Sequence, residues 1–360
     1  MLEPATMLHC NSAIAAVVLA GAALSLPAQK PPNPDPAQAP SLTVDRDPVR
    51  SPDGASIPAN AAVGEVRKES GGYILRQDVE EVVLNATVLD GNRLVQDLKK
   101  ENFTVFEDGV KQNVISFQHT DLPVSIALVV DNSGSMSKKR PAVNKSALDL
   151  IEASNPQDEA FVVNFSDEAF IDQEFTSEVN KLRDGLSHIE SRGGTALYDA
   201  VVASADKLAA DAKRPKQVLV LITDGEDNAS TLNSEQTIRR VQQLSGPVIY
   251  SIGLLFGDEM SHSEVRHARR ALEMLSTETG GIAYFPKSLE QVDEIAAEVA
   301  RDIRSQYTIG YHSSKPMTDT AFRRVQVIAE EKGAKLNVRT RTGYFPVPRS
   351  SKRSSAQSVK

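Results

Sequence analysis

The stretch that decides the fold is Ser125-Ile126-Ala127-Leu128-Val129-Val130-Asp131-Asn132-Ser133-Gly134-Ser135. Its first half is a short apolar run that contains β-branched residues, which is typical of a strand buried on both faces of a parallel sheet. Its second half is polar, so it predicts one carboxylate and two hydroxyls where that strand ends. Open α/β sheets bind their ligands at the carboxyl edge of the strands. The stretch therefore indicates both an α/β fold and the place of a functional site.

Two later segments add oxygen-bearing side chains at the same edge. Thr195 follows a pair of glycines, which let a loop approach closely, and Asp224 comes just after a second apolar run, residues 218–222. The complete set has two carboxylates and three hydroxyls: Asp131, Ser133, Ser135, Thr195 and Asp224. Mg²⁺ takes oxygen ligands and keeps several waters. This set therefore predicts one Mg²⁺ or Mn²⁺ with a coordination position left open.

Strand and helix patterns alternate from about residue 122 to residue 304. Strands are predicted at residues 125–130, 160–165, 169–175, 217–223, 248–252 and 282–285, and helices near residues 141–154, 179–189, 196–210, 234–244, 265–277 and 289–303. Such alternation predicts an α/β fold with a doubly wound, mostly parallel sheet. The short link between residues 165 and 169 favours a hairpin, and hence one antiparallel edge strand.

The segments on either side of this region have a β pattern. Strands are predicted at residues 81–89, 102–107 and 114–117 before it, and at residues 307–311, 322–329 and 336–341 after it. Three strands cannot bury a core alone. We therefore expect both groups to form one small β-sandwich-like lobe, with the α/β domain inserted between its halves.

The N-terminus has the pattern of an export signal. Residues 13–26 are apolar, fewer than the ~20 needed to cross a bilayer, and small residues follow. We predict a signal peptide over residues 1–28, cleaved after Ala28, and a protein that is secreted or lies in the periplasm or cell envelope. Cys10 is the only cysteine and lies within the predicted signal peptide, so we expect the mature chain to have no thiol and no disulfide. We also expect no transmembrane segment in the mature chain.

These patterns divide the 360-residue chain into six parts. After the signal peptide come a disordered Pro-rich linker (29–72), an N-terminal β half-lobe (73–120), the α/β domain (121–305), a C-terminal β half-lobe (306–345) and a disordered tail (346–360). The formal net charge of −8 argues against nucleic acid as a partner.

Residues 122–304 resemble a von Willebrand factor type A domain. That family's metal-ion-dependent adhesion site, or MIDAS, has the motif Asp-x-Ser-x-Ser, a distant Thr, and an Asp usually followed by Gly. The motif stands complete here as Asp131, Ser133, Ser135, Thr195 and Asp224. The flanks resemble bacterial secreted proteins that carry such a domain. The resemblance implies that the serine and threonine hydroxyls ligate the ion, that the carboxylates do so directly or through water, and that a protein partner adds an acidic side chain.

Other interpretations of the same residues fit less well. Asp131 and Ser133 could instead cap a helix. A calcium loop would need Glu at its twelfth position, which is Ala142, and a haloacid-dehalogenase-type phosphoryl transferase would need an acid in place of Ser133. A serine hydrolase would need Gly-x-Ser-x-Gly around Ser135, which is absent.

Two histidines are also candidate metal ligands. His262 and His267 lie five residues apart, which puts them on different faces of a helix, so we expect them to be solvated and not to bind zinc. The functional hypotheses are then a metal-dependent protein-binding module, a structural or assembly component of the envelope and, third, a Mg²⁺-dependent hydrolase. We expect that the protein is not an enzyme, because the sequence places no general base near the predicted ion.

Overall fold

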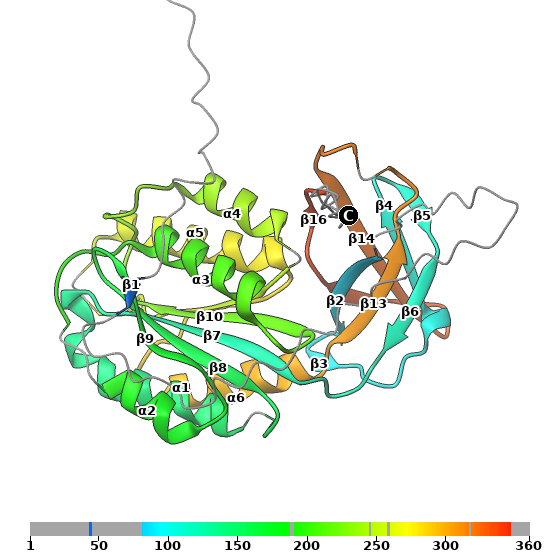
Figure 1. The fold of residues 1–360 in the computed structure, drawn as a ribbon. Helices are drawn as coiled ribbons and strands as arrows, with labels where there is room; N and C mark the ends of the chain where they lie inside the picture. Colours follow the sequence, from blue (N-terminus) through cyan, green and yellow to red (C-terminus); the bar gives the residue numbers. More distant parts are fainter. Residues whose placement is uncertain are drawn as a thin grey trace, which may run out of the picture. The chain divides into compact units, whose positions relative to one another are not determined.

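The middle of the chain folds into a seven-stranded sheet in the computed structural model (Figure 1). The structure describes residues 43–44, 81–153, 155–187, 191–244, 246–257, 260–316 and 318–346. The strands are β1 (Thr43–Val44), β7 (Val124–Asp131), β8 (Glu159–Phe165), β9 (Ala169–Thr176), β10 (Lys216–Thr223), β11 (Val248–Gly253) and β12 (Ala283–Tyr284). Their order is β1-β9-β8-β7-β10-β11-β12.

The pairing is parallel throughout this sheet except between β8 and β9. The predicted doubly wound, mostly parallel sheet with one antiparallel strand is therefore confirmed. The antiparallel strand β9 is not the predicted edge strand, because β1 pairs with its other side. β1 comes from the segment predicted to be a structureless linker, and it pairs with Phe170 and Ile171 of β9. For these two residues the linker prediction is wrong, because their backbone extends the sheet beyond β9.

Helices cover both faces of the sheet (Figure 1). One face packs against α1 (Arg140–Glu152), α2 (Val179–Ser187) and α6 (Gln291–Arg304), and the other against α3 (Leu197–Asp211), α4 (Ser234–Gln243) and α5 (His262–Thr279). β7 supplies both cores in alternation: Ile126 and Leu128 face the first layer, whereas Ala127 and Val129 face the second. Its burial on both faces makes β7 the central strand that its sequence predicts.

The two flanks share a second, antiparallel sheet. Its strands are β2 (Glu81–Asp90), β3 (Arg93–Leu94), β4 (Phe103–Glu107), β5 (Val110–Gln112), β6 (Val114–Gln118), β13 (Tyr307–His312), β14 (Arg323–Glu331), β15 (Ala334–Arg339) and β16 (Gly343–Tyr344). The order is β5-β4-β14-β15-β2-β13-β6, with β16 on β14 and β3 on β2. Strands from the two flanks thus interleave and bury one core, as expected. They do so as one nine-stranded, near-barrel sheet and not as two facing sheets.

The chain enters and leaves the α/β region at neighbouring points. The His119 ring, just before β7, stacks on the Tyr307 ring of β13 with centroids 4.2 Å apart. Arg304, at the end of α6, lies 3.5 Å from Asp121. These contacts fit an inserted domain, although its limits at residues 121 and 305 stay predictions. The predicted signal peptide, the tail from residue 347 and the linker apart from β1 lie outside the described residues.

Candidate metal site

The carboxyl end of β7 carries a buried carboxylate. Asp131 has no solvent exposure. One of its oxygens accepts from the Ser133 backbone N–H (2.7 Å) and the other from the Thr223 hydroxyl at the end of β10 (2.6 Å). Burial raises the pKa of Asp131 to about 6, and its hydrogen bonds to Thr223 and Ser133 oppose that rise. A buried carboxylate of this kind favours a cation nearby.

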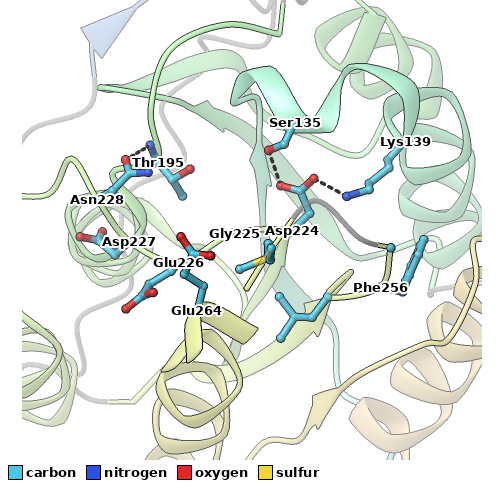
Figure 2. Close-up of a pocket in the computed structure, with 13 residues that line it drawn as sticks. Ser135, Lys139, Thr195, Asp224, Gly225, Glu226, Asp227, Asn228, Phe256 and Glu264 are labelled. Carbon is cyan, nitrogen blue, oxygen red and sulfur yellow. Dashed lines mark hydrogen bonds and ion pairs between the residues drawn. The ribbon is translucent and has the colours of Figure 1, made fainter. Parts of the chain in front are cut away.

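The two serine hydroxyls of the motif lie side by side in the turn after β7. This turn includes the short 3-10 helix η3 (Gly134–Lys138). Ser133 Oγ and Ser135 Oγ are 3.1 Å apart, and Ser135 Oγ donates to Asp224 Oδ1 at 2.8 Å (Figure 2). The turn therefore connects the end of β7 to the acid that follows β10.

The loop that brings Thr195 to the site depends on its two glycines. Gly193 has φ +79°, and a Cβ there would lie 2.3 Å from an Asp167 carboxylate oxygen. The Gly194 N–H donates to Asp167 Oδ1 (2.7 Å), and the Thr195 N–H donates to Asn228 Oδ1 (2.8 Å; Figure 2). The loop is therefore tied to residues near the ends of β8 and β10.

The structure brings the five predicted residues to one edge of the sheet, although not to one surface. Ser135, Thr195 and Asp224 line a cavity of about 240 Å³. Asp131 and Ser133 lie behind it, with exposures of 0% and 3%. Of the motif residues, the cavity therefore exposes two hydroxyls and one carboxylate, while the second carboxylate and the third hydroxyl are buried. Glu226, Asp227 and Glu264 also line the cavity.

The geometry of these donors fits a small divalent cation. Neighbouring ligands of Mg²⁺, each at about 2.1 Å in an octahedron, stand about 3.0 Å apart. The oxygens of Ser133 and Ser135, at 3.1 Å, and those of Ser135 and Asp224, at 2.8 Å, already have this spacing. All the donors are hard oxygens, so the set suits Mg²⁺ or Mn²⁺ better than zinc.

Nothing in the described part of the chain supports a histidine or all-carboxylate metal centre. No three His, Cys, Asp or Glu side chains gather there in a way that could hold a metal. His262 and His267 are both exposed on α5, as expected, and His267 lies 3.2 Å from Glu226. A metal site at the sheet edge consequently depends on hydroxyl ligands.

Sequence reasoning missed several residues of the cavity. Lys139 donates to Asp224 Oδ2 at 2.5 Å, and Asn228 holds the Thr195 loop. The loop after β11 adds an apolar wall from Leu255, Phe256 and Met260. A signal for this wall existed: β11 is parallel to β10, so the loop after it must emerge at the same edge. No comparable signal marks Lys139.

Comparison with known proteins agrees with this architecture. Residues 126–226, from β7 to just after Asp224, match the family model of the von Willebrand factor type A domain. This part of the chain is therefore similar to a von Willebrand factor type A domain. The match includes all five residues of the predicted MIDAS motif. No helix in the described part of the chain has the length and apolar character needed to cross a membrane.

Two proteins from other organisms are similar to this chain in sequence. The chain is 26% identical over 262 residues to inter-alpha-trypsin inhibitor heavy chain H4 of Homo sapiens, covering 66% of this chain and 27% of that protein. Against the Bos taurus protein of the same name, identity is 24% over 224 residues, covering 56% and 23% respectively. The chain therefore spans only about a quarter of the length of these relatives.

Two solved structures align with part of this chain at low identity. A von Willebrand factor type A protein from Catenulispora acidiphila aligns with TM-score 0.45 and 13% identity, over 72% of this chain and 75% of that chain. The PilB minor pilin from Streptococcus sanguinis aligns with TM-score 0.42 and 16% identity, over 51% and 62% respectively.

Proposed function

We propose that this protein is a metal-dependent protein-binding module that acts outside the cytoplasm, secreted or in the periplasm or cell envelope. Its A-type domain holds one Mg²⁺ or Mn²⁺ at the carboxyl edge of the parallel sheet. The proposed ligands are Asp131, Ser133, Ser135, Thr195 and Asp224, with the two carboxylates acting directly or through water.

The observation that carries this proposal is the spacing of the oxygens beside β7. Ser133, Ser135 and Asp224 come from two strand ends that are distant in sequence, yet Ser135 Oγ lies 3.1 Å from Ser133 Oγ and 2.8 Å from Asp224 Oδ1. Turn formation alone explains why the hydroxyls of Ser133 and Ser135 lie close together, because the two residues are only two positions apart. It does not explain Asp224, which the parallel pairing of β7 and β10 brings to the same place.

The partner is proposed to supply an acidic side chain to the ion. The cavity over the site is open to solvent and has a hydroxyl and carboxylate floor. An ion with an open coordination position stays electrophilic and accepts a further carboxylate. The apolar wall of Leu255, Phe256 and Met260 gives the same partner a surface to pack against. We assign the site a binding role and not a catalytic one.

The test is capture of partners from an envelope extract on the immobilised full chain. Capture is expected with Mg²⁺, not with EDTA, and again when Mg²⁺ is restored. Asp131→Ala should abolish capture, whereas Asp211→Ala, an exposed acid at the end of α3, should not. Capture that survives both EDTA and Asp131→Ala would show a binding surface independent of the metal and would refute the proposal.

A further inference from the structure

Lys139 forms an ion pair with one of the proposed metal ligands. Its Nζ lies 2.5 Å from Asp224 Oδ2, and the two side chains are only 14% and 1% exposed. The ammonium also lies 5.7 Å from the centre of the Phe256 ring. Figure 2 shows Lys139 and Ser135 approaching the Asp224 carboxylate from different sides. Both oxygens of Asp224 are therefore engaged by this chain's own donors.

Lys139 has a different environment from the two basic residues next to it in the sequence. Lys138 is exposed, and Arg140 is buried on the far side of the turn, where its guanidinium donates to Asn164 Oδ1 at 3.0 Å. Among these three consecutive basic residues, Lys139 is the one that lines the cavity. The pairing with Asp224 therefore depends on the shape of the turn and not on a general excess of positive charge.

A divalent cation at the proposed site and the Lys139 ammonium need the same carboxylate. Asp224 Oδ1 accepts from Ser135, so an ion held by Ser135 and Asp224 stands within a few ångströms of the ammonium on Oδ2. A charge of +2 and a charge of +1 so close repel each other strongly, because little water reaches the nearly buried Asp224. Metal binding must then either displace Lys139 or proceed against its charge.

We propose that Lys139 is an internal cation that competes with the divalent metal for Asp224 and so lowers the metal affinity of the site. This inference rests on the proposed function, since it assumes that the site binds a metal. Lys139 holds Asp224 in place while no metal is bound. Because it lowers the affinity, the site needs a higher metal concentration outside the cell to be occupied. It is thus a residue that tunes affinity and not a metal ligand.

The test compares Lys139→Met with Lys138→Met in the full chain. Both changes remove one positive charge, but only the first removes the ion pair. Calorimetric titration with Mn²⁺ is expected to give at least about tenfold tighter binding for Lys139→Met and a change of less than about twofold for Lys138→Met. Lys139→Gln keeps a hydrogen-bond donor without the charge, so it should also bind more tightly and serves if Lys139→Met does not fold.

Thermal unfolding separates competition from a structural role. Without metal, Lys139→Met should melt below the wild type, because Asp224 loses its partner. With saturating Mn²⁺ its melting temperature should rise by more than that of the wild type. If Lys139 only supported the turn, Lys139→Met would instead bind Mn²⁺ more weakly than the wild type.

The outcomes distinguish this inference from the proposed function. If the wild type binds Mn²⁺ and Lys139→Met and Lys139→Gln bind it equally or more weakly, the competition is refuted and the metal site stands. If the wild type does not bind but Lys139→Met does, the competition is supported. If none of the three proteins binds Mn²⁺, both proposals are wrong.

Discussion

The loop that carries Thr195 should be the most sensitive point of the site to a single added methyl group. Gly193 has φ +79°, a conformation in which a non-glycine residue costs roughly 1–2 kcal/mol. A Cβ there would also stand 2.3 Å from Asp167 Oδ2. Asp167 is exposed and free to rotate away, but it then gives up its 2.7 Å hydrogen bond from the Gly194 N–H. Loss of a hydrogen bond to a charged group costs about 1.5 kcal/mol or more.

Gly193→Ala is therefore expected to lower the free energy of unfolding by about 3 kcal/mol, the sum of the backbone strain and the lost hydrogen bond. It should also weaken Mn²⁺ binding more than about tenfold, since a shift of about 1 Å in a ligand such as Thr195 exceeds what an octahedral site tolerates. Urea denaturation and calorimetric titration measure the two effects.

Two further variants make this prediction specific. Gly134→Ala is the matched control: Gly134 lies within the motif itself, yet a Cβ there meets nothing within 4 Å. It should change neither stability nor metal affinity appreciably. In an Asp167→Ala background, Gly193→Ala should cost only the backbone strain, about 1–2 kcal/mol. If Gly193→Ala is as stable as Gly134→Ala and binds Mn²⁺ equally well, the account of the loop is wrong.

Two other predictions concern the rest of the chain. Burial lowers the pKa of Lys216, at the start of β10, to about 8. Between pH 7.5 and 9.5 the unfolded chain therefore binds more protons than the folded chain, and the stability should rise by about 2 kcal/mol relative to that of Lys216→Met. Urea titrations of both proteins at pH 7.5 and 9.5 measure this difference, and parallel pH profiles would contradict it. Truncation after Arg304 removes β13 and β15, the two long strands that pair with β2, and leaves only the two-residue β3 beside it. Hydrogen exchange should then show lost amide protection in β2 while β7 and β10 keep theirs. Full protection of β2 in the truncated chain would show that the N-terminal strands fold without the C-terminal ones.

Much of the α/β region was predictable because its signals are local. The apolar run before Asp131 and the alternation of strands and helices were enough to predict a doubly wound sheet. The motif residues lie in the turns after β7 and β10 and, for Thr195, in the loop before α3. Helix limits were less accurate. α5 begins at His262, before the predicted residue 265, because Ser261 and Glu264 form a capping box. That pattern, Ser followed three residues later by Glu, was present in the sequence as a start signal.

The strand order and register of the β lobe depend on contacts that no local pattern specifies. Alternating apolar residues predicted β2 and β13 as strands, but their register and the place of β13 between β2 and β6 come from packing of the whole lobe. β1 consists of only two residues, too few for a periodic signal.

The run Lys138-Lys139-Arg140 shows the limit of sequence reasoning most clearly. The residues are chemically alike and adjacent, yet one is exposed, one pairs with Asp224 and one is buried beside Asn164. Burial lowers the pKa of Arg140 to about 10, although the nearby Asp131 opposes that shift. The direction of each side chain is set by the 3-10 turn that precedes α1, and a composition or periodicity argument does not predict such a turn.

The most direct test of the central claim is to locate the ion. Crystals of the full chain grown with Mn²⁺ should give an anomalous difference peak within bonding distance of the hydroxyl oxygens of Ser133 and Ser135, on the side that faces Thr195. The same peak should be absent from crystals of Asp131→Ala grown under the same conditions. A wild-type structure at saturating Mn²⁺ that shows no peak at this edge of the sheet, or a peak held only by exposed carboxylates elsewhere, would contradict the account.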